Sequence, residues 1–296
     1  MTSATLETPA LPSAIDPAPR PRRSTLSKLL RNRSALIGGI IVLVFVLMAV
    51  LAPILPIADP LKSNFLAIRK PPSELYWLGT DELGRDQVSR LFYGAQASLL
   101  AGIVSVMIAL VVGIPFGLLS GWYGGWIDIA ISRVTEAMLA CPFLILAIAF
   151  AAILGPSLAN AMIAIGLSAV PIFVRLVRGQ VMSVKAEDFV EGARSVGARD
   201  MRIMFVHVLP NTLSPIIVQA TLFMAQAIIL EAALSFLGLG QQPPSPSWGQ
   251  MLNVAKNFME QAPWMSVAPG IAIFVAVLGF NLLGDGLRDA LDPKES

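Results

Sequence analysis

Residues 187–211 read EDFVEGARSVGARDMRIMFVHVLPN and form a charged segment between two long apolar runs. Before Gly197, charged side chains recur at the spacing of a helix, at Glu187, Glu191 and Arg194. A glycine between two helical patterns favours a turn. The pattern therefore predicts two short helices that are hinged at Gly197.

The second helix of this hairpin is predicted from an apolar pattern after Asp200, which we expect to be the N-cap. The apolar face has the spacing i, i+3, i+4, i+7 and consists of Met201, Met204, Phe205 and Val208. Pro210 lacks the amide proton that a helix interior needs, so we expect the helix to end there. We infer that a charged hairpin between membrane spans is retained because another protein docks on it.

The composition indicates a membrane protein. The 296 residues are 55% hydrophobic and 14% charged, with a mean hydropathy of +0.72, whereas a soluble domain has roughly 25% charged residues. We therefore expect an all-α polytopic membrane protein. The single cysteine, Cys141, excludes an intramolecular disulfide, and the single histidine, His207, excludes a multi-histidine metal centre. The first 34 residues contain no apolar run, so no cleavable signal peptide is expected at Met1.

Uncharged runs predict six transmembrane spans, since about 20 apolar residues cross a bilayer. The expected spans are Ser34–Ala58 and residues 95–119, 136–154, 157–176, 213–237 and 266–285. We divide the chain into a cytoplasmic tail with a basic flank (1–33), a first span with an outer loop (34–94), a core of five spans (95–290) and a C-terminal tail (291–296).

The placement of positive charge predicts the orientation. With six spans, 15 of the 21 Lys and Arg residues lie in segments on the side of the N-terminus. Positive charge collects on the cytoplasmic side of membrane proteins, so both termini and residues 187–211 are expected in the cytoplasm.

The outer loop predicted between the first two spans carries carboxylates that alternate with arginines. Thr80 and Asp81 are possible helix caps and Gly84 a possible turn. The alternation favours ion pairing over a catalytic site.

Small residues follow spacings of three and four along the expected span at 95–119. They are Ser98, Gly102, Ser105, Ala109, Gly113 and Gly117. Such a stripe lets helix backbones approach closely in lipid, so we expect it to pack against another helix. The aromatic residues Trp122, Tyr123 and Trp126 are expected at the membrane interface.

Motifs for chemistry are absent from the sequence. There is no GxxxxGK[ST] phosphate loop, no GxGxxG after a strand, no HExxH and no GxSxG. We expect no nucleotide, cofactor, metal, nucleic acid or catalytic site in this chain.

Three polar residues fall within the fifth expected span, where burying them is costly and often functional. Glu231 faces a translocation path or makes a packing contact, and both interpretations stay open. Gln219 and Gln226, seven residues apart, share a helix face and either line a polar route or bond to a neighbouring helix. Cys141-Pro142 and Pro171 mark places where spans are expected to bend.

The segment 187–211 resembles the EAA signature of ABC-importer permeases. The matching residues are Glu191-Gly192-Ala193, Gly197 and Leu209-Pro210-Asn211. Gly192 departs from the Ala of the pattern, and His207 stands where the pattern prefers Ile. A His-x-Leu-Pro-Asn ending is typical of the peptide branch of the family.

Further segments resemble the second permease subunit of the dipeptide/oligopeptide/nickel branch, so that the similarity covers residues from about 25 to 293. These are GTDELGRDQVSR (79–90), LSFLGLGQQPPSPSWGQML (234–252) and GDGLRDALDP (284–293). The resemblance implies a type I importer permease in the bacterial inner membrane. It implies as partners a second permease subunit, two ATPase subunits that use the ATP, and an extracytoplasmic substrate-binding protein.

The resemblance also assigns a role to the hairpin, as the coupling loop that rests on the ATPase. The residues concerned are Glu187, Glu191, Gly192, Ala193, Gly197, His207, Leu209, Pro210 and Asn211. The alternatives are a self-sufficient secondary carrier that uses Glu231, or the same permease fold serving nickel chelates, glutathione or opines. A membrane-embedded enzyme ranks last, because no catalytic set is present.

Overall fold

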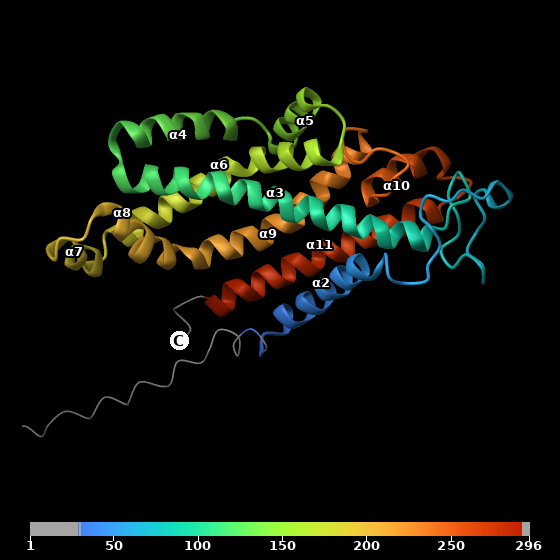
Figure 1. Ribbon diagram of the computed structural model, residues 1–296, viewed down its shortest axis with the longest axis horizontal. Helices are drawn as coiled ribbons and strands as arrows, with labels where there is room; N and C mark the ends of the chain where they lie inside the picture. Colours follow the sequence, from blue (N-terminus) through green and yellow to red (C-terminus); the bar gives the residue numbers. More distant parts are fainter. Residues whose placement is uncertain (1–28, 30, 292–296) are drawn as a thin grey trace, which may run out of the picture.

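The computed structural model describes residues 29 and 31–291, and the regular elements of this part are helices joined by turns and loops (Figure 1). Its helices are α2 (Arg33–Leu51), α3 (Gln87–Tyr123), α4 (Gly125–Leu139), α5 (Phe143–Leu154), α6 (Leu158–Lys185), α7 (Asp188–Ser195), α8 (Asp200–Arg202), α9 (Leu209–Phe236), α10 (Trp248–Ala255) and α11 (Trp264–Leu291). Short 3₁₀ turns lie at Phe65–Ala67 and Lys256–Phe258, and a π turn at Ile203–Val208. The all-α expectation is confirmed. The expected tails lie largely outside the described residues.

The described residues contain five helical stretches that can span a membrane, or six if one bent helix pair is counted as a span, against six expected from the sequence. Five helical stretches are long and apolar enough to cross a bilayer, namely α2, α3, α6, the continuous stretch Asp200–Phe236 and α11. A sixth span is possible only as α4 and α5 together, and these are bent by 94°. The span expected at 136–154 is therefore divided between the end of α4 and α5. The bend at Cys141-Pro142 is confirmed: Pro142 is the N-cap residue of α5, and a proline disfavours helical geometry at the residue before it.

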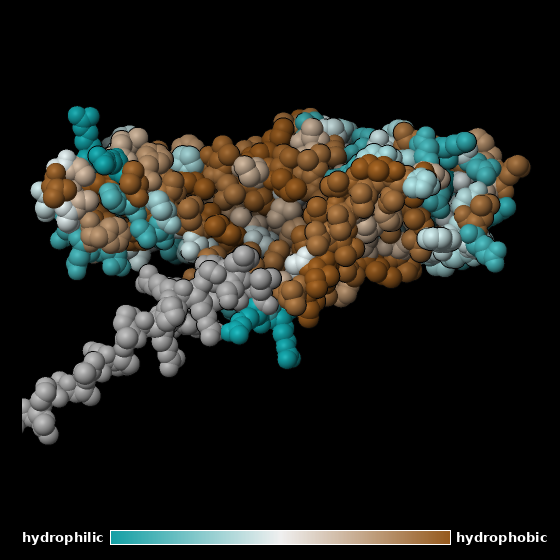
Figure 2. Space-filling view, turned by 60° about the horizontal axis from the view of Figure 1, so that its bottom comes forward, coloured by the Kyte–Doolittle hydropathy of each residue, from teal (hydrophilic) through white to brown (hydrophobic). Residues whose placement is uncertain are grey.

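The helices form an elongated bundle (Figure 1). One end carries residues 186–208 and is called the hairpin end. The other carries residues 52–86 and 238–263 and is called the loop end. Figure 2 shows a wide hydrophobic band between two hydrophilic ends, as expected of a chain that crosses a bilayer. On α2, apolar side chains such as Ile40 and Val50 are more than half exposed, which fits contact with lipid.

The predicted stripe of small residues is confirmed as a packing surface on α3. All six stripe residues are buried, and the row continues at Gly121. A Cβ added at Gly113 or Gly117 would lie 2.6 Å from the Cβ of Phe173 or Val177 on α6. Because real Cβ contacts are wider than this, only glycine permits so close an approach. α3 and α6 run parallel along this contact.

The start of α3 corrects several expectations. The helix begins at Gln87, so the division that we expect at residue 94 lies inside it. Its N-cap is Asp86, whose carboxylate accepts from the Ser89 amide at 2.8 Å. Thr80 and Asp81 cap no helix, because the Thr80 hydroxyl donates to the Ala67 carbonyl and Asp81 accepts from amides of its own turn. The predicted turn at Gly84 is confirmed by its φ of 74°.

Candidate functional site

The hinge predicted at Gly197 is a helix-ending turn. The Gly197 amide bonds to the Arg194 carbonyl at 2.9 Å, and the Ala198 amide to the Ala193 carbonyl at 3.1 Å. This pair of bonds is the Schellman motif, which needs a residue with positive φ, and Gly197 has φ 81°. An added Cβ at Gly197 would meet nothing within 4 Å, so the backbone alone requires glycine here.

The second helix of the hairpin does not stop at Pro210. α8, the π turn and α9 form one helical stretch from Asp200 to Phe236, so the expected end at Pro210 was wrong. Pro210 is the second residue of α9, where its missing amide costs little because the π turn has already broken the α pattern. The Asn211 side chain donates to the His207 carbonyl at 2.6 Å across this junction. Asp200 is the first residue of α8, after Arg199 in the N-cap position, and is not the cap.

The π turn also divides the apolar face that we expect on this helix. Met204 and Val208 are buried, whereas Met201 is 57% exposed and Phe205 51% exposed. One extra residue in a helical turn rotates the following side chains, so the α-helical spacing no longer describes one face. The four residues therefore lie on two faces.

The exposed apolar residues of the hairpin form a surface that we call the hairpin rim. It consists of Phe189, Val196, Met201, Phe205 and Val206, each between 45% and 83% exposed. Exposed charged residues, including Glu191 and Arg194, lie among them along the chain. An exposed apolar patch with a polar surround is typical of a surface that binds another protein.

The hairpin is fixed to the bundle by an apolar cluster at the ends of α3 and α6. Its buried members are Leu118, Trp122, Val177, Val181, Val190, Ile203, Met204, Val208 and Ile216. Trp122 is 3% exposed, so its placement at a lipid interface was wrong, whereas Trp126 is 78% exposed. The Arg194 guanidinium lies 5.0 Å and the Lys185 ammonium 5.4 Å from the Trp122 ring centroid. Such cation–π contacts contribute about 0.5–2 kcal/mol each.

The remaining hairpin residues singled out by the sequence are mostly exposed. Glu187 is the N-cap position of α7 without a side-chain bond, and Glu191 lies in the first turn, where negative charge suits the helix dipole. Gly192 faces open space, since an added Cβ would meet nothing within 4 Å. Ala193 and Leu209 pack against the buried cluster.

The polar residues of α9 lie in two different environments. Gln219 lines a groove of about 730 Å³ between α6, α9 and α11, together with Gln180, Asn211, Ser214 and Arg288. Gln226 is exposed on the same face of α9. Glu231 is fully buried, and the hydroxyls of Ser98 and Ser235 donate to its carboxylate at 3.0 and 2.7 Å.

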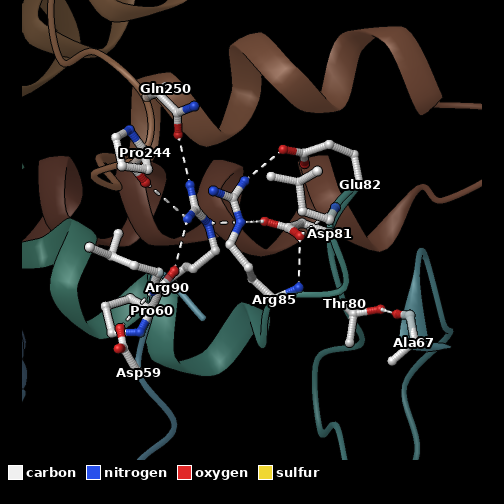
Figure 3. A network of polar contacts seen from close by, with 12 residues as sticks. Asp59, Pro60, Ala67, Thr80, Asp81, Glu82, Arg85, Arg90, Pro244 and Gln250 are labelled. Atoms are coloured by element: carbon white, nitrogen blue, oxygen red, sulfur yellow. Dashed lines mark hydrogen bonds and ion pairs between the residues drawn. The ribbon is translucent and has the colours of Figure 1, made fainter. Parts of the chain in front are cut away.

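At the loop end, the predicted ion pairing is confirmed and is centred on two arginines (Figure 3). Arg85 contacts both Asp81 and Glu82 at 2.6 Å. Arg90, at the start of α3, is 1% exposed and lies 3.3 Å from Asp81. It also donates to the Pro60 carbonyl at 3.0 Å, the Pro244 carbonyl at 3.3 Å and the Gln250 side chain at 3.0 Å.

This network joins both loop-end segments to α3. Within it, Glu82 is in an electrostatically unfavourable position. Burial and the nearby Asp81 charge raise the pKa of Glu82, and one of its oxygens has no hydrogen-bond partner in the described chain. Burial also raises the pKa of Asp86. Among the described residues, no three His, Cys, Asp or Glu side chains gather in a metal-binding arrangement.

The bundle with its protruding hairpin has the fold of an ABC importer permease. It is similar to a structure of inward-facing conformations of the MetNI methionine ABC transporter, with a TM-score of 0.56 over 69% of this chain and 97% of that chain, at 22% identity. Residues 113–296 match the family described as binding-protein-dependent transport system inner membrane component. This chain belongs to that family. Residues 20–72 also match the N-terminal TM domain of oligopeptide transport permease C.

Relatives with similar sequences extend along nearly the whole chain. The dipeptide transport system permease protein DppC of Alkalihalophilus pseudofirmus is 50% identical, over 93% of this chain and 90% of the relative. DppC of Haemophilus influenzae is 46% identical, over 89% and 92%. The glutathione transport system permease protein GsiD of Pectobacterium atrosepticum is 44% identical, over 93% and 91%. The resemblance to dipeptide/oligopeptide ABC permeases is confirmed.

Proposed function

We propose that this chain is one of two membrane subunits of an ATP-driven importer of dipeptides or short oligopeptides. ATP is hydrolysed by separate ATPase subunits, and an extracytoplasmic binding protein delivers the substrate. The peptide class rests on the relatives, two of which are named as dipeptide permeases. Glutathione, itself a short peptide, is the second candidate, since a relative of 44% identity is named for it.

The hairpin rim carries the proposal, as the surface on which an ATPase subunit docks. Its apolar side chains are exposed although the helices beneath them are anchored through fully buried residues such as Val190 and Ile203. An apolar surface held in a fixed conformation binds without a large loss of conformational entropy. The coupling-loop assignment of Glu187, Glu191, Gly192, Ala193, Gly197, His207, Leu209, Pro210 and Asn211 remains part of this proposal.

A path for the substrate is proposed along the polar side of α9. Gln219 and Gln226 are seven residues apart on one face, and the groove at Gln219 adds further polar side chains. Exposed amides at membrane depth are costly in contact with lipid, so this face is proposed to line a water-filled path shared with the second membrane subunit. Glu231 is assigned a packing role because it is fully buried among hydroxyl donors.

The proposed orientation puts the hairpin end in the cytoplasm of a bacterial cell, with the chain in the inner membrane. An ATPase can dock only where ATP is present. The charge bias of Lys and Arg toward this side supports the same orientation. The loop end then faces the binding protein.

The test uses the full complex, purified and reconstituted in liposomes with a dipeptide-loaded binding protein. In one variant, Val196→Asp and Met201→Asp place charge on the hairpin rim. In the matched control, Leu75→Asp and Trp77→Asp change side chains of the loop end that are 80% and 76% exposed. We expect the first variant to lose ATPase co-purification and dipeptide uptake, and the control to keep co-purification. Retained co-purification in the rim variant would contradict the docking proposal.

A further inference from the structure

Trp122 is the point at which three elements of the hairpin end meet. It lies in the last turn of α3 and is 3% exposed. Lys185 at the end of α6 donates from Nζ to the Trp122 carbonyl at 2.5 Å and lies over the same indole ring. Arg194 of α7 approaches that ring at 5.0 Å. Trp122 thus contacts both Lys185 at the end of α6 and Arg194 of the hairpin.

The attachment of α7 to the bundle is otherwise small. Val190 is the single buried residue of α7, and it belongs to the apolar cluster that contains Trp122. The opposite face of the helix is exposed, as are Gly192 and Ser195. Displacement of α7 therefore acts on the spans through its short connection to α6, through Val190 and Ala193, and through the cation that Arg194 places over the Trp122 ring.

Next to Trp122, the ends of α3 and α6 are in close contact. A Cβ at Gly121 would lie 2.8 Å from the Cβ of Val181, which shows that the ends of α3 and α6 are in close backbone contact. A helix whose last turn is held between a partner helix and the hairpin has little freedom to absorb displacement by local bending.

We propose that Trp122 is a positioning residue for coupling, and that its indole transmits displacement of the docked hairpin to α3 and α6 through Arg194 and Lys185. The inference rests on the proposed function, because it requires an ATPase that moves α7. A cation–π contact adds an electrostatic attraction between the exposed Arg194 guanidinium and the face of the buried Trp122 ring, which an aliphatic contact lacks. The indole face and not only the side-chain volume then matters for coupling.

The experiment compares three variants in the complete reconstituted complex. Trp122→Leu removes the aromatic face and keeps an apolar side chain, whereas Trp122→Phe keeps an aromatic face. Trp126→Leu is the matched control, since Trp126 lies four residues further along and is 78% exposed. For each complex we measure co-purified ATPase, ATP hydrolysis stimulated by the loaded binding protein, and dipeptide taken up per ATP hydrolysed.

We expect Trp122→Leu to keep ATPase co-purification but to lower uptake per ATP about fivefold or more. Trp122→Phe should recover at least about half of this loss, and Trp126→Leu should match the wild type. Unchanged uptake per ATP in Trp122→Leu would overturn the inference. Equal losses in co-purification and uptake would do the same, because they indicate a merely structural role.

A second pair of variants keeps the inference testable if Trp122→Leu does not fold. Arg194→Gln removes the cation over the ring, and Arg199→Gln is its control on the same hairpin. Arg199 is exposed and approaches no aromatic ring in the described chain. Uptake per ATP should fall in Arg194→Gln alone, and equal values in both variants would refute the role of the cation. If the wild-type chain binds no ATPase, the proposed function itself fails, which is a separate result.

Discussion

Arg178 of α6 forms a bidentate ion pair with Asp128 of α4, in which Nε lies 2.6 Å from Oδ1 and Nη2 lies 2.8 Å from Oδ2. The hydroxyls of Ser120 and Ser132 donate to the same carboxylate at 2.5 and 3.1 Å. Two parallel charge-assisted bonds fix an orientation that a single contact does not. The pair therefore sets how α4 leaves the end of α3.

The contribution of this pair can be measured by a double-mutant cycle. Asp128→Asn and Arg178→Gln, alone and together, should give a coupling free energy of about 1 kcal/mol, because both side chains are only partly buried. The readout is thermal unfolding of the purified protein in detergent. The pair Arg133–Glu136, which is largely exposed on α4, should give no measurable coupling. Equal coupling in both pairs would contradict the special role of Arg178.

Arg90 is expected to stabilise the loop end more than any other single side chain there. Arg90→Ala removes one donor group from four acceptors, leaves buried acceptors unpaired, and should lower the free energy of unfolding by about 3 kcal/mol. Arg90→Lys should recover less than half of this, since an ammonium cannot reach all four acceptors. Thermal unfolding and protease cleavage of residues 52–86 measure the effect. Lys62→Ala, at an exposed position, is the control and should change neither.

Gly192 of α7 and Gly197, which follows the C-cap of α7, should respond to alanine in opposite directions. Gly192→Ala should stabilise the helix by about 1 kcal/mol, because nothing lies within 4 Å of the added Cβ. Gly197→Ala should destabilise the hairpin by about 1 kcal/mol, because its φ of 81° suits only glycine. Hydrogen exchange of the α7 amides distinguishes the two variants, since it should slow in Gly192→Ala and accelerate in Gly197→Ala. Slower exchange in Gly197→Ala would contradict the assigned turn.

Glu231→Gln separates the proposed importer from an ion-coupled carrier. The hydroxyls that contact Glu231 can rotate to accept as well as donate hydrogen bonds. The glutamine amide should therefore fit, with a decrease of about 1 kcal/mol or less in the free energy of unfolding. Uptake driven by ATP should persist in this variant. A carrier that uses this carboxylate for ion coupling would lose uptake while keeping its folded structure, and that outcome would favour the alternative reading.

The stability of the loop end should depend on pH through Glu82. Its pKa is raised from 4.5, first by burial and then by Asp81, so the folded chain binds the proton more tightly than the unfolded chain. The stabilising contribution is therefore present below pH 4.5 and is lost as the pH rises through the raised pKa. The unfolding temperature of the wild type should fall as the pH rises through this window, and the fall should be smaller in Glu82→Gln. A steeper fall in the variant would contradict the assignment.

Much of the architecture could be predicted because it depends on local or periodic signals. Uncharged runs locate the spans, and small residues recur at spacings of three and four along α3. A glycine between two helical patterns indicates the turn at Gly197. The alternation of charge around Arg85 correctly indicated ion pairs. These features are contained in residues that are close together in the chain.

The remaining features depend on contacts between distant segments, or on local changes of helix type that the amino-acid sequence does not indicate. The π turn at Ile203–Val208 has a sequence that fits an α-helix equally well, so the exposure of Phe205 could not be predicted. The run from residue 137 to the end of α5 is uncharged, and Pro142 indicates a bend without its angle. Trp122 resembles an interfacial aromatic residue until α7 folds back and places Arg194 over it.

The close contact between α3 and α6 limits what the bundle can do. Gly113, Gly117 and Gly121 each face a side chain sixty positions further along, at Phe173, Val177 and Val181. Both rows repeat every four residues, so a slide of less than about one helical turn, roughly 5.4 Å, would press side chains against backbone. Sliding positions between two such registers are excluded by steric clashes, so α3 and α6 have to move together as a single rigid body. Any conformational cycle of this subunit is then a matter of tilting that body against α9 and α11.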